Sequence, residues 1–445
     1  MRDLLRHKRI GASLLAVTVL AGCTTGSGQD AASSSSTAAG ASASVNPSSS
    51  SVDPAPPATA TERVTVEVPA GLAQAPFDQP RQVTVPAGWR LSVWARTPRP
   101  RLAVWAPDGS LLVSVPSAGT VLRFRPQGAG AEQSVLLDGL DQPHGLALAG
   151  STLYVAQSDQ VDAYDYADGA ARNPRTVAAG LPDAKSPDLR GAYAHALKSV
   201  AVGPDGSVYF SIGSTGNISA ADRSADPPRA TIMRVPPGGG PAAPFATGVR
   251  NGTGLAVAPD GSLWTAVNGR DNIADPATAR VDLAYVGEHP REQIARLTPG
   301  RELGWPYCNV DGGPANLPFV RDLQTNPDGA RLDCAALPPV EQSMGAHSAP
   351  LGMSFVDGTL PAPFAQGALI GVHGSWNRQP PREPELSFYP WRAGTLGDQQ
   401  TLVGGFQGEN GTRWGRPVAG VVGPDGAVYI TDDNAGAIYR LTPPG

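Results

Sequence analysis

The stretch Ser199-Val-Ala-Val-Gly-Pro-Asp-Gly206-Ser-Val-Tyr-Phe210 decides the fold of this chain. Apolar runs lie on both sides of Pro-Asp-Gly, a tripeptide that favours a tight turn. Proline presets the conformation at the start of such a turn, and glycine adopts the positive φ that other residues rarely accept. The stretch therefore predicts two antiparallel strands joined by a short turn.

The same unit recurs along the chain. Clear copies turn at Gly109, Gly206, Gly261 and Gly426, and degenerate copies turn at Gly150 and Gly358. Each copy continues into a third strand-like segment such as Thr231-Ile-Met-Arg-Val235, and the chain is rich in glycine (53 residues) and proline (45 residues). Six repeated units of short strands predict an all-β fold, a six-bladed β-propeller.

The first 23 residues are typical of an export signal, with a basic head, the short apolar run Ile10–Leu20 and small residues before Cys23. Leu20-Ala-Gly-Cys23 resembles the lipobox of bacterial lipoproteins, in which the cysteine is lipidated; a plain signal peptide is the alternative. Residues 24–63 are mostly Ser, Ala, Thr, Gly and Pro, which predicts a flexible tether. We expect an exported protein, lipid-anchored to the outer face of a bacterial membrane, with its propeller at residues 64–445.

The remaining cysteines lie in an insertion. The fourth and fifth turns, near Asp260 and Asp357, are separated by nearly a hundred residues, and Cys308 and Cys334 fall between them. Because exported compartments are oxidising, we expect a disulfide that pins an insertion between the fourth and fifth repeats. The formal net charge of −5 gives no reason to expect nucleic acid as a partner.

Polar residues recur just before the first strand of five repeats, where propeller loops converge on the central channel. This set comprises Gln142, His144, His195, Lys198, Arg250, Asn251, His347 and Arg416. Histidines, arginines and a lysine around one axis would bind a small polyanion, since guanidinium groups fork onto carboxylates. For Lys198 a solvated or salt-bridged lysine is the alternative.

A second polar set follows two outgoing strands. Asn268-Gly-Arg-Asp271 offers carbonyl and carboxylate oxygens that suit a hard cation such as Ca2+. His373-Gly-Ser-Trp376-Asn-Arg378 leaves the fifth repeat. We expect the indoles of Trp264 and Trp376 to pack within blades rather than to contact substrate.

These motifs resemble the glucose/sorbosone dehydrogenase family, quinoproteins that use pyrroloquinoline quinone (PQQ). The resemblance runs from about Pro86 to the C-terminus. It rests on His195-x-x-Lys198, Arg250-Asn251, Val-Asn268-Gly-Arg-Asp271, Gly304-Trp-Pro-Tyr-Cys308, His347-Ser-Ala-Pro, His373-Gly-Ser-Trp-Asn-Arg378 and Gly415-Arg-Pro. The sorbosone branch is the more similar one.

The resemblance implies a catalytic propeller with PQQ over the channel and Ca2+ bridging the quinone and backbone carbonyls. It implies His195 as the catalytic base and Arg250 with Asn251 as cofactor contacts. Arg416 falls near the arginines that hold cofactor carboxylates. The family's fifth-blade lysine has no clean counterpart, and His373 and Arg378 are the candidates for its place. Asn268, Gly269 and Asp271 take the place of the metal loop.

The expected reaction is the oxidation of a sugar or a related alcohol or aldehyde. Neutral imidazole suits removal of a hydroxyl proton, while the hydride passes to PQQ, polarised by Ca2+. Electrons must leave to a separate acceptor, because the chain lacks a Cys-x-x-Cys-His haem-attachment motif. A calcium-dependent lactonase-type hydrolase and a non-enzymatic binding propeller remain alternatives, and the oligomeric state stays open.

Overall fold

The computed structural model describes residues 60–312 and 317–445. The predicted signal segment 1–23, the lipidation site Cys23 and the tether up to residue 59 lie outside the described residues. Strand β1 (Thr61–Thr65) pairs with β2 (Gln82–Pro86), so the last residues expected in the tether belong to the folded part. No helix among the described residues is long and apolar enough to cross a membrane.

Six sheets, in which the strands that make up each blade pair antiparallel, form six blades, which confirms the predicted all-β propeller. The first blade contains β4 (Ala103–Trp105), β5 (Leu111–Val115), β6 (Thr120–Gln127) and β7 (Gly130–Leu137). The second contains β8 (Gly145–Ala149), β9 (Thr152–Ala156), β10 (Val161–Ala167) and β11 (Ala170–Ala178). The third contains β12 (Val200–Val202), β13 (Val208–Ile212), β14 (Thr231–Val235) and β15 (Ala243–Thr247).

The other three blades continue the ring. The fourth contains β16 (Gly254–Val257), β17 (Leu263–Val267), β18 (Glu292–Leu297) and β22 (Gln342–Met344). The fifth contains β23 (Pro350–Asp357), β24 (Gln366–Val372) and β25 (Glu385–Arg392), with β26 (Thr395–Leu396) and β27 (Gln400–Val403) both paired to β25. The sixth contains β28 (Pro417–Val422), β29 (Val428–Asp432), β30 (Ala437–Thr442) and β3 (Arg90–Arg96).

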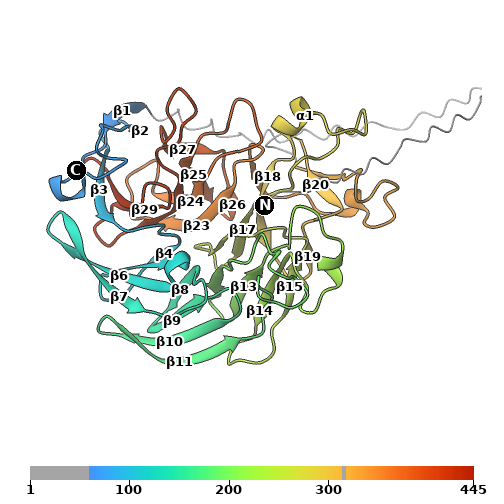
Figure 1. The fold of residues 1–445 in the computed structure, drawn as a ribbon, viewed down its shortest axis with the longest axis horizontal. Coiled ribbons are helices and arrows are strands. Elements are labelled where there is room, and N and C mark those ends of the chain that lie inside the picture. Colours follow the sequence, from blue (N-terminus) through green and yellow to red (C-terminus); the bar gives the residue numbers. More distant parts are fainter. Residues whose placement is uncertain (1–59, 313–316) are drawn as a thin grey trace, which may run out of the picture. The chain divides into compact units, whose positions relative to one another are not determined.

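The two ends of the folded part close the ring together. Strand β3 comes from the N-terminal side and pairs antiparallel with β30 from the C-terminal side, with Leu91 opposite Leu441. In Figure 1 the chain runs once around the ring, from blue β3 through green β13–β15 to the red strands beside β3. Because this sheet combines strands from both ends of the folded part, it leaves no free edge where the ring begins and ends.

The Pro-Asp-Gly turns and the strands after them explain the repeat. Asp205 Oδ1 accepts a hydrogen bond of 2.9 Å from the Ser207 amide, and Gly206 has a φ of +82°. Every residue of the strand that follows, β13, is buried, and the same holds for β5, β17 and β29. These second strands are covered on both faces by neighbouring blades, so their sequences are mostly apolar.

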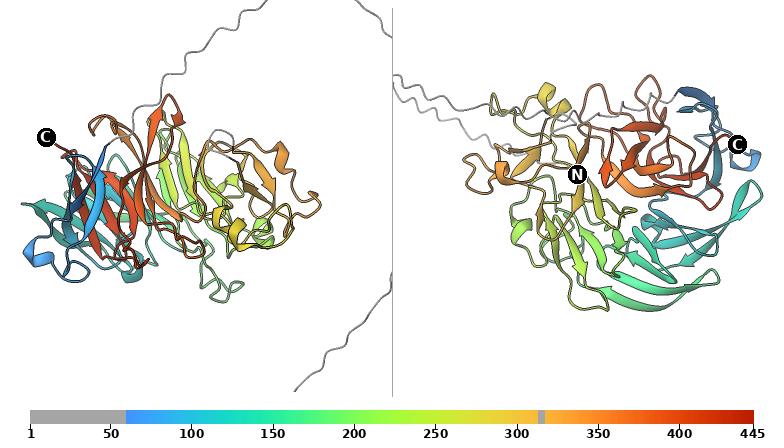
Figure 2. Two further views of the ribbon diagram at one scale, coloured as in Figure 1. Left: turned by 90° about the horizontal axis from the view of Figure 1, so that it is seen from above. Right: turned by 180° about the vertical axis from the view of Figure 1, so that it is seen from behind.

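Apolar packing between blades forms the core. Trp264 of β17 is fully buried and meets Trp391 of β25 edge to face, at 5.5 Å between ring centroids. The contact joins the fourth blade to the fifth, so the prediction that Trp264 is a packing residue is confirmed. Figure 2 shows the blades from the side and from behind.

The predicted insertion between the fourth and fifth repeats is present, and it comes before β22, the last strand of the fourth blade. Helix α1 (Leu283–Glu288) separates β17 from β18. Between β18 and β22 come β19 (Arg301–Glu302), β20 (Cys308–Val310), β21 (Phe319–Arg321) and the 3-10 turn η4 (Cys334–Ala336). Further 3-10 turns are η1 (Ala70–Leu72), η2 (Pro116–Ala118) and η3 (Ala221–Ser224). The repeat pattern did not reveal β22, the outermost strand of the blade, because this strand is only three residues long.

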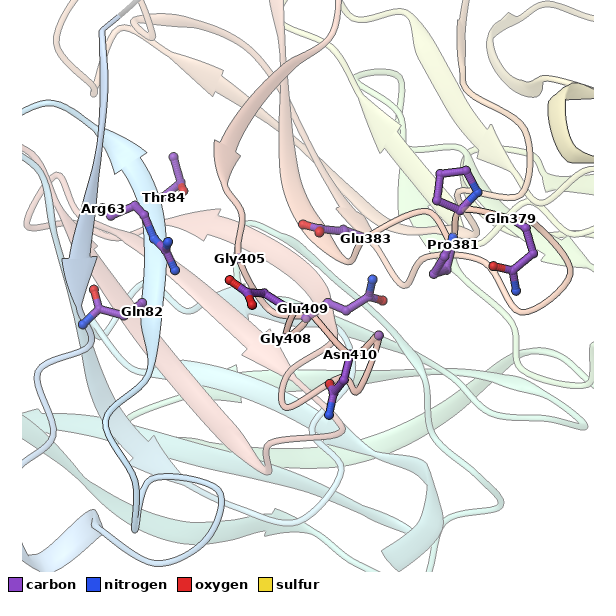
Figure 3. A pocket seen from close by; sticks show the side chains of 13 residues that line it. Arg63, Gln82, Thr84, Gln379, Pro381, Glu383, Gly405, Gly408, Glu409 and Asn410 are labelled. Carbon is purple, nitrogen blue, oxygen red and sulfur yellow. The ribbon is translucent and has the colours of Figure 1, made fainter.

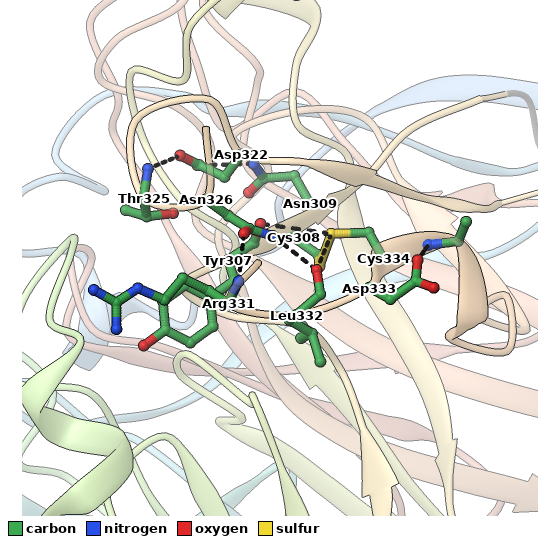
Figure 4. The surroundings of a disulfide bond; sticks show 12 residues. Tyr307, Cys308, Asn309, Asp322, Thr325, Asn326, Arg331, Leu332, Asp333 and Cys334 are labelled. Carbon is green, nitrogen blue, oxygen red and sulfur yellow. Dashed lines mark hydrogen bonds between the residues drawn. A yellow bond between two sulfur atoms is a disulfide. The ribbon is translucent and has the colours of Figure 1, made fainter. Parts of the chain in front are cut away.

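The predicted disulfide is present in this insertion. Cys308 on β20 is bonded to Cys334 on η4, 26 residues further along the chain (Figure 4). Asn326 lies beside the bond and donates a hydrogen bond of 2.8 Å to the Leu332 carbonyl. The cross-link therefore ties the end of the insertion back to its start.

Candidate functional site

Loops that enter the innermost strands bring polar side chains to one end of the propeller. His144 directly precedes β8, Arg250 precedes β16 and Arg416 precedes β28. Their contacts form two groups. We call Arg101, His144, His373, Arg416 and Asp433 the Asp433 cluster, and Asn217, Arg250, Asp271, His347 and Asn377 the Asp271 cluster.

The Asp433 cluster joins the first, second, fifth and sixth blades. Arg101 Nη1 donates to Asp433 Oδ2 at 2.7 Å, and His373 Nε2 lies 3.3 Å from Asp433 Oδ1. Arg416 Nη2 lies 2.6 Å from His373 Nδ1, and Arg101 Nη2 lies 3.5 Å from His144 Nε2. Residues from four blades are thus held around one carboxylate.

These contacts fix protonation in the Asp433 cluster. A guanidinium only donates, so Arg416 leaves the His373 proton on Nε2, which faces Asp433. Burial and the charges of Arg101 and Arg416 lower the pKa of His373 to about 4, although Asp433 acts in the opposite direction. Burial and the Arg101 charge lower the pKa of His144 to about 3. Burial alone would raise the pKa of Asp433, but His373 and Arg101 hold it far below its usual range. At neutral pH the histidines are neutral, and the cluster carries two arginine charges against one carboxylate.

The Asp271 cluster joins the third, fourth and fifth blades. Arg250 Nη2 lies 3.4 Å from Asp271 Oδ2, and His347 Nδ1 lies 3.4 Å from Asp271 Oδ1. Asn377 Nδ2 donates to Asp271 Oδ1 at 3.1 Å. Asn217 Nδ2 donates to the Asp271 carbonyl, and Asn217 Oδ1 accepts from the Asp271 amide, both at 2.8 Å. Both the side chain and the backbone of Asp271 are therefore held by the other residues of the cluster.

His195 is half-buried beside Arg250, and its partners define its tautomer. Its Nδ1 lies 2.9 Å from both the carbonyl oxygen and the hydroxyl oxygen of Ser214. The Ser214 hydroxyl donates its own hydrogen to the Gly216 carbonyl at 2.7 Å, so both oxygens facing His195 accept. Nδ1 therefore carries the proton and Nε2 has a free lone pair. Burial and the Arg250 charge lower the pKa of His195 to about 4.

Lys198 shares a motif with His195 but has other partners. Its side chain is fully buried, and its ammonium donates to the carbonyl oxygens of Ser158, Pro182 and Ala196. Burial lowers the pKa of Lys198 to about 7. All three protons are taken by the backbone, so this geometry leaves Lys198 no donor for a cofactor, contrary to the predicted contact.

The remaining predicted contacts are spread over several environments. Gln142 is exposed, with a φ of +48°, and the Asn251 carbonyl accepts from the Asn268 amide at 3.0 Å. Arg378 donates to Glu288 of α1 at 2.7 Å and to the carbonyl of Ala346, the residue before His347, at 3.4 Å. His347 Nε2 lies 2.6 Å from the Val286 carbonyl of α1. The insertion therefore supports His347 and engages Arg378.

Three features of the site were missed from the sequence. Arg101 lies just before the first strand of the first repeat. The search for polar residues before first strands would have found it if that search had covered all six repeats. Asp433 directly follows β29, the second strand of the last repeat. Asn217 and Asn377 lie in loops whose contact with Asp271 no local pattern reveals.

The site fits a planar polyanion. The Nε atoms of Arg101, Arg250 and Arg416 are buried and have no hydrogen-bond partner among the described residues. Buried donors without partners cost free energy, and a ligand with carboxylate oxygens would satisfy them. PQQ carries such carboxylates, so the residues present fit that group.

The predicted metal residues fit Ca2+ less well. Asp271 already faces Arg250 and His347, while the Asn268 carbonyl accepts from Arg250 Nη1 at 3.2 Å and the Gly269 amide donates to Glu292. Among residues 60–312 and 317–445, no group of three or more His, Cys, Asp or Glu side chains is placed to hold a metal. A carboxylate facing cationic groups is a poor ligand for another cation, so Asp271 does not fit the predicted role.

Known proteins share this fold. The chain is 24% identical over 420 residues to a pyrroloquinoline quinone-dependent pyranose dehydrogenase of Coprinopsis cinerea, covering 82% of this chain and 55% of that protein. The chain thus spans about half the length of the curated relatives it matches.

Solved structures give the same architecture. The holo PQQ domain of the Coprinopsis cinerea pyranose dehydrogenase superposes with a TM-score of 0.68 at 20% identity, covering 81% of this chain and 97% of that one. The PQQ-bound aldose sugar dehydrogenase of Streptomyces coelicolor gives a TM-score of 0.52 at 17% identity, covering 80% and 99%. At these identities the two structures show the shared fold. The family match and the curated relative confirm the predicted resemblance to PQQ-dependent sugar dehydrogenases, while the sorbosone branch stays a prediction. Residues 83–444 match the family model described as TrAA12-like, and the chain belongs to that family.

Proposed function

We propose that this protein is a PQQ-dependent dehydrogenase that oxidises a sugar or a related alcohol or aldehyde. The observation that carries the proposal is the environment of His195, a neutral imidazole whose Nε2 lone pair is available. It lies beside Arg250, one of three site arginines whose buried Nε donors have no partner among the described residues. The names of the family's relatives supply the cofactor and the substrate class.

In this proposal His195 is the general base. Two Ser214 oxygens keep the proton on Nδ1, so Nε2 accepts the proton of the substrate hydroxyl. PQQ, when bound, supplies an electrophilic quinone that takes up the hydride. Arg101, Arg250 and Arg416 bind its carboxylates and orient it. Asp433 holds Arg101 and His373 in place for that task.

The finer parts of the proposal concern metal, acceptor and location. Ca2+ stays a prediction, with the Asn268 and Gly269 carbonyls as its remaining candidate ligands, and removal of Ca2+ by a chelator tests it. Electrons pass to a separate carrier, and Cys23 carries a lipid that anchors the exported protein. Loss of detergent partitioning in Cys23→Ala would support that anchor. Aldose or sorbosone remains open as substrate type.

The test is a titration followed by turnover. The purified protein is titrated with PQQ in the presence of Ca2+, and the absorbance of PQQ is followed. Reduction of an artificial dye is then measured with a panel of aldoses and sorbosone. A PQQ spectrum that does not change on addition of protein would refute the proposal. Dye-independent hydrolysis of lactones would favour the lactonase alternative.

A further inference from the structure

Trp376 is exposed where packing was expected. The prediction that it packs within a blade was wrong: 76% of its surface is accessible, while the indole of Trp264 is fully buried. An indole is one of the largest apolar side chains, and a folded chain gains by covering it. A tryptophan left this open on an anchored loop suggests a ligand that covers it.

The loop holds Trp376 at the rim of the site. On one side, Ser375 pairs with Arg382: its Oγ accepts from the Arg382 amide at 2.8 Å, and its amide donates to the Arg382 carbonyl at 3.2 Å. Arg413 also donates to the Ser375 carbonyl. On the other side, Asn377 donates to Asp271 at 3.1 Å. The backbone of Trp376 is thus fixed directly beside the Asp271 cluster.

A second exposed apolar side chain lies at the same rim. Ile218 is 45% exposed and directly follows Asn217, which binds both backbone groups of Asp271. Trp376 and Ile218 are therefore each one residue away from an asparagine held on Asp271. Both exposed apolar side chains therefore lie next to residues of the Asp271 cluster.

The same loop also lines a polar cleft. The cleft measures about 830 Å3 and lies between β1–β2, the loop that follows β24 and the loop that follows β27 (Figure 3). Gln379 and Glu383, soon after Trp376, contribute to it. Its other polar side chains include Gln82, Gln407, Glu409 and Asn410. Amides and carboxylates at this density suit a ligand rich in hydroxyl groups.

We propose that the loop between β24 and β25 binds saccharide units beyond the one that is oxidised, an inference that rests on the proposed function. The flat face of Trp376 stacks on the C–H face of a pyranose ring, and the cleft side chains hydrogen-bond hydroxyl groups of the following units. The substrate class is then an oligosaccharide or a polysaccharide end rather than only a free monosaccharide. An apolar ligand would leave the amides and carboxylates of the cleft without partners.

The test measures binding apart from turnover. The PQQ-loaded protein is titrated calorimetrically with cellotriitol, maltotriitol and mannotriitol, reduced trisaccharides that lack an oxidisable anomeric centre. We expect at least one to bind, Trp376→Ala to weaken that binding at least tenfold, and Trp376→Phe to weaken it by about threefold or less. The ratio of kcat/KM for the matching trisaccharide to that for its monosaccharide should fall in Trp376→Ala. Val135→Ala, which truncates a 59%-exposed side chain on β7, is the matched control and should change neither quantity.

The outcomes separate this inference from the proposed function. The inference is overturned if none of the three alditols binds, or if Trp376→Ala changes the binding constant by less than twofold. This holds even if the enzyme oxidises monosaccharides. Trp376-dependent binding in a protein that never reduces dye supports the saccharide site and refutes the dehydrogenase proposal. Slower electron transfer to a protein acceptor in Trp376→Ala, with unchanged alditol binding, assigns the indole to that acceptor and overturns the inference.

Discussion

His195 Nδ1 lies 2.9 Å from two oxygens of Ser214, its carbonyl and its hydroxyl. The hydroxyl hydrogen is already donated to Gly216, so neither oxygen can give a proton to the ring. One serine thereby decides which nitrogen of His195 is basic. The backbone that supplies this serine directly follows β13, so the fold itself positions the base.

Replacement of His195 should remove most of the turnover and leave the cofactor bound. Loss of a general base costs about 10²- to 10⁴-fold in rate, so we expect His195→Ala to lower kcat by that factor. The measurement is dye reduction, together with a PQQ titration that should be nearly unchanged. His289→Ala is the control, because His289 stacks on Tyr285 of α1, outside both clusters. Full turnover of His195→Ala would remove this residue from the base role.

The acid limb of the pH profile should lie unusually low. Burial and Arg250 lower the pKa of His195 to about 4, against an ordinary value near 6.5. The base is the neutral form, which dominates above the pKa and is lost as pH falls through it. We expect kcat/KM to stay level from pH 7 to about 5 and to fall below that. An acid limb centred near pH 6.5 would contradict a desolvated environment for His195.

Arg416 should matter for PQQ affinity more than for stability. Its Nη2 contacts His373, while its buried Nε has no partner among the described residues. Arg416→Gln removes the positive charge and the paired N–H donors that bind a carboxylate, so PQQ should bind about 10- to 100-fold more weakly. Arg125→Gln, which breaks an exposed ion pair with Glu132, should leave the affinity unchanged. The affinity is read from the absorbance titration.

The fold was predictable because one signal repeats. Pro-Asp-Gly between apolar runs recurs, and buried second strands such as Val208–Ile212 are mostly apolar. The insertion between the fourth and fifth repeats was predictable, but the strand Gln342–Met344 that follows it is too short to show a period. Local pattern therefore gave the number of blades, but tertiary pairing alone identified the outermost strand of the fourth blade.

The candidate site was predictable only in its positions. Residues before inner strands must face the channel end, which places His144, His195 and Arg250 without knowledge of contacts. Pairing between distant loops was not accessible, since Asn377 reaches Asp271 across 106 residues of sequence. The same limit explains Lys198, because two of its three carbonyl partners, Ser158 and Pro182, come from segments outside its motif.

Lys198 should contribute stability rather than cofactor affinity. Lys198→Met keeps much of the volume but leaves the Ser158, Pro182 and Ala196 carbonyls without their donor, so we expect unfolding free energy to fall by about 3 kcal/mol or more. Burial lowers the pKa of Lys198 to about 7 in the folded protein. Between pH 7 and about 10 the unfolded chain therefore binds more protons at this residue than the folded protein does. Wild-type stability should rise with pH across that window relative to Lys198→Met. Denaturant unfolding at several pH values measures both effects, and PQQ affinity should be affected less than in Arg416→Gln.

Reduction of the Cys308–Cys334 disulfide should loosen the insertion and leave the blades intact. The bond closes a loop of 26 residues, for which the chain-entropy model gives about 3 kcal/mol. The insertion carries β20, β21 and η4, none of which belongs to a blade sheet, so it can open locally. We expect reductant to speed proteolytic cleavage between β20 and η4 while cleavage in the β12–β15 blade stays unchanged. The double variant Cys308→Ser/Cys334→Ser should be cleaved rapidly with or without reductant. Equal cleavage of oxidised and reduced wild-type protein would mean that packing, rather than the cross-link, holds the insertion in place.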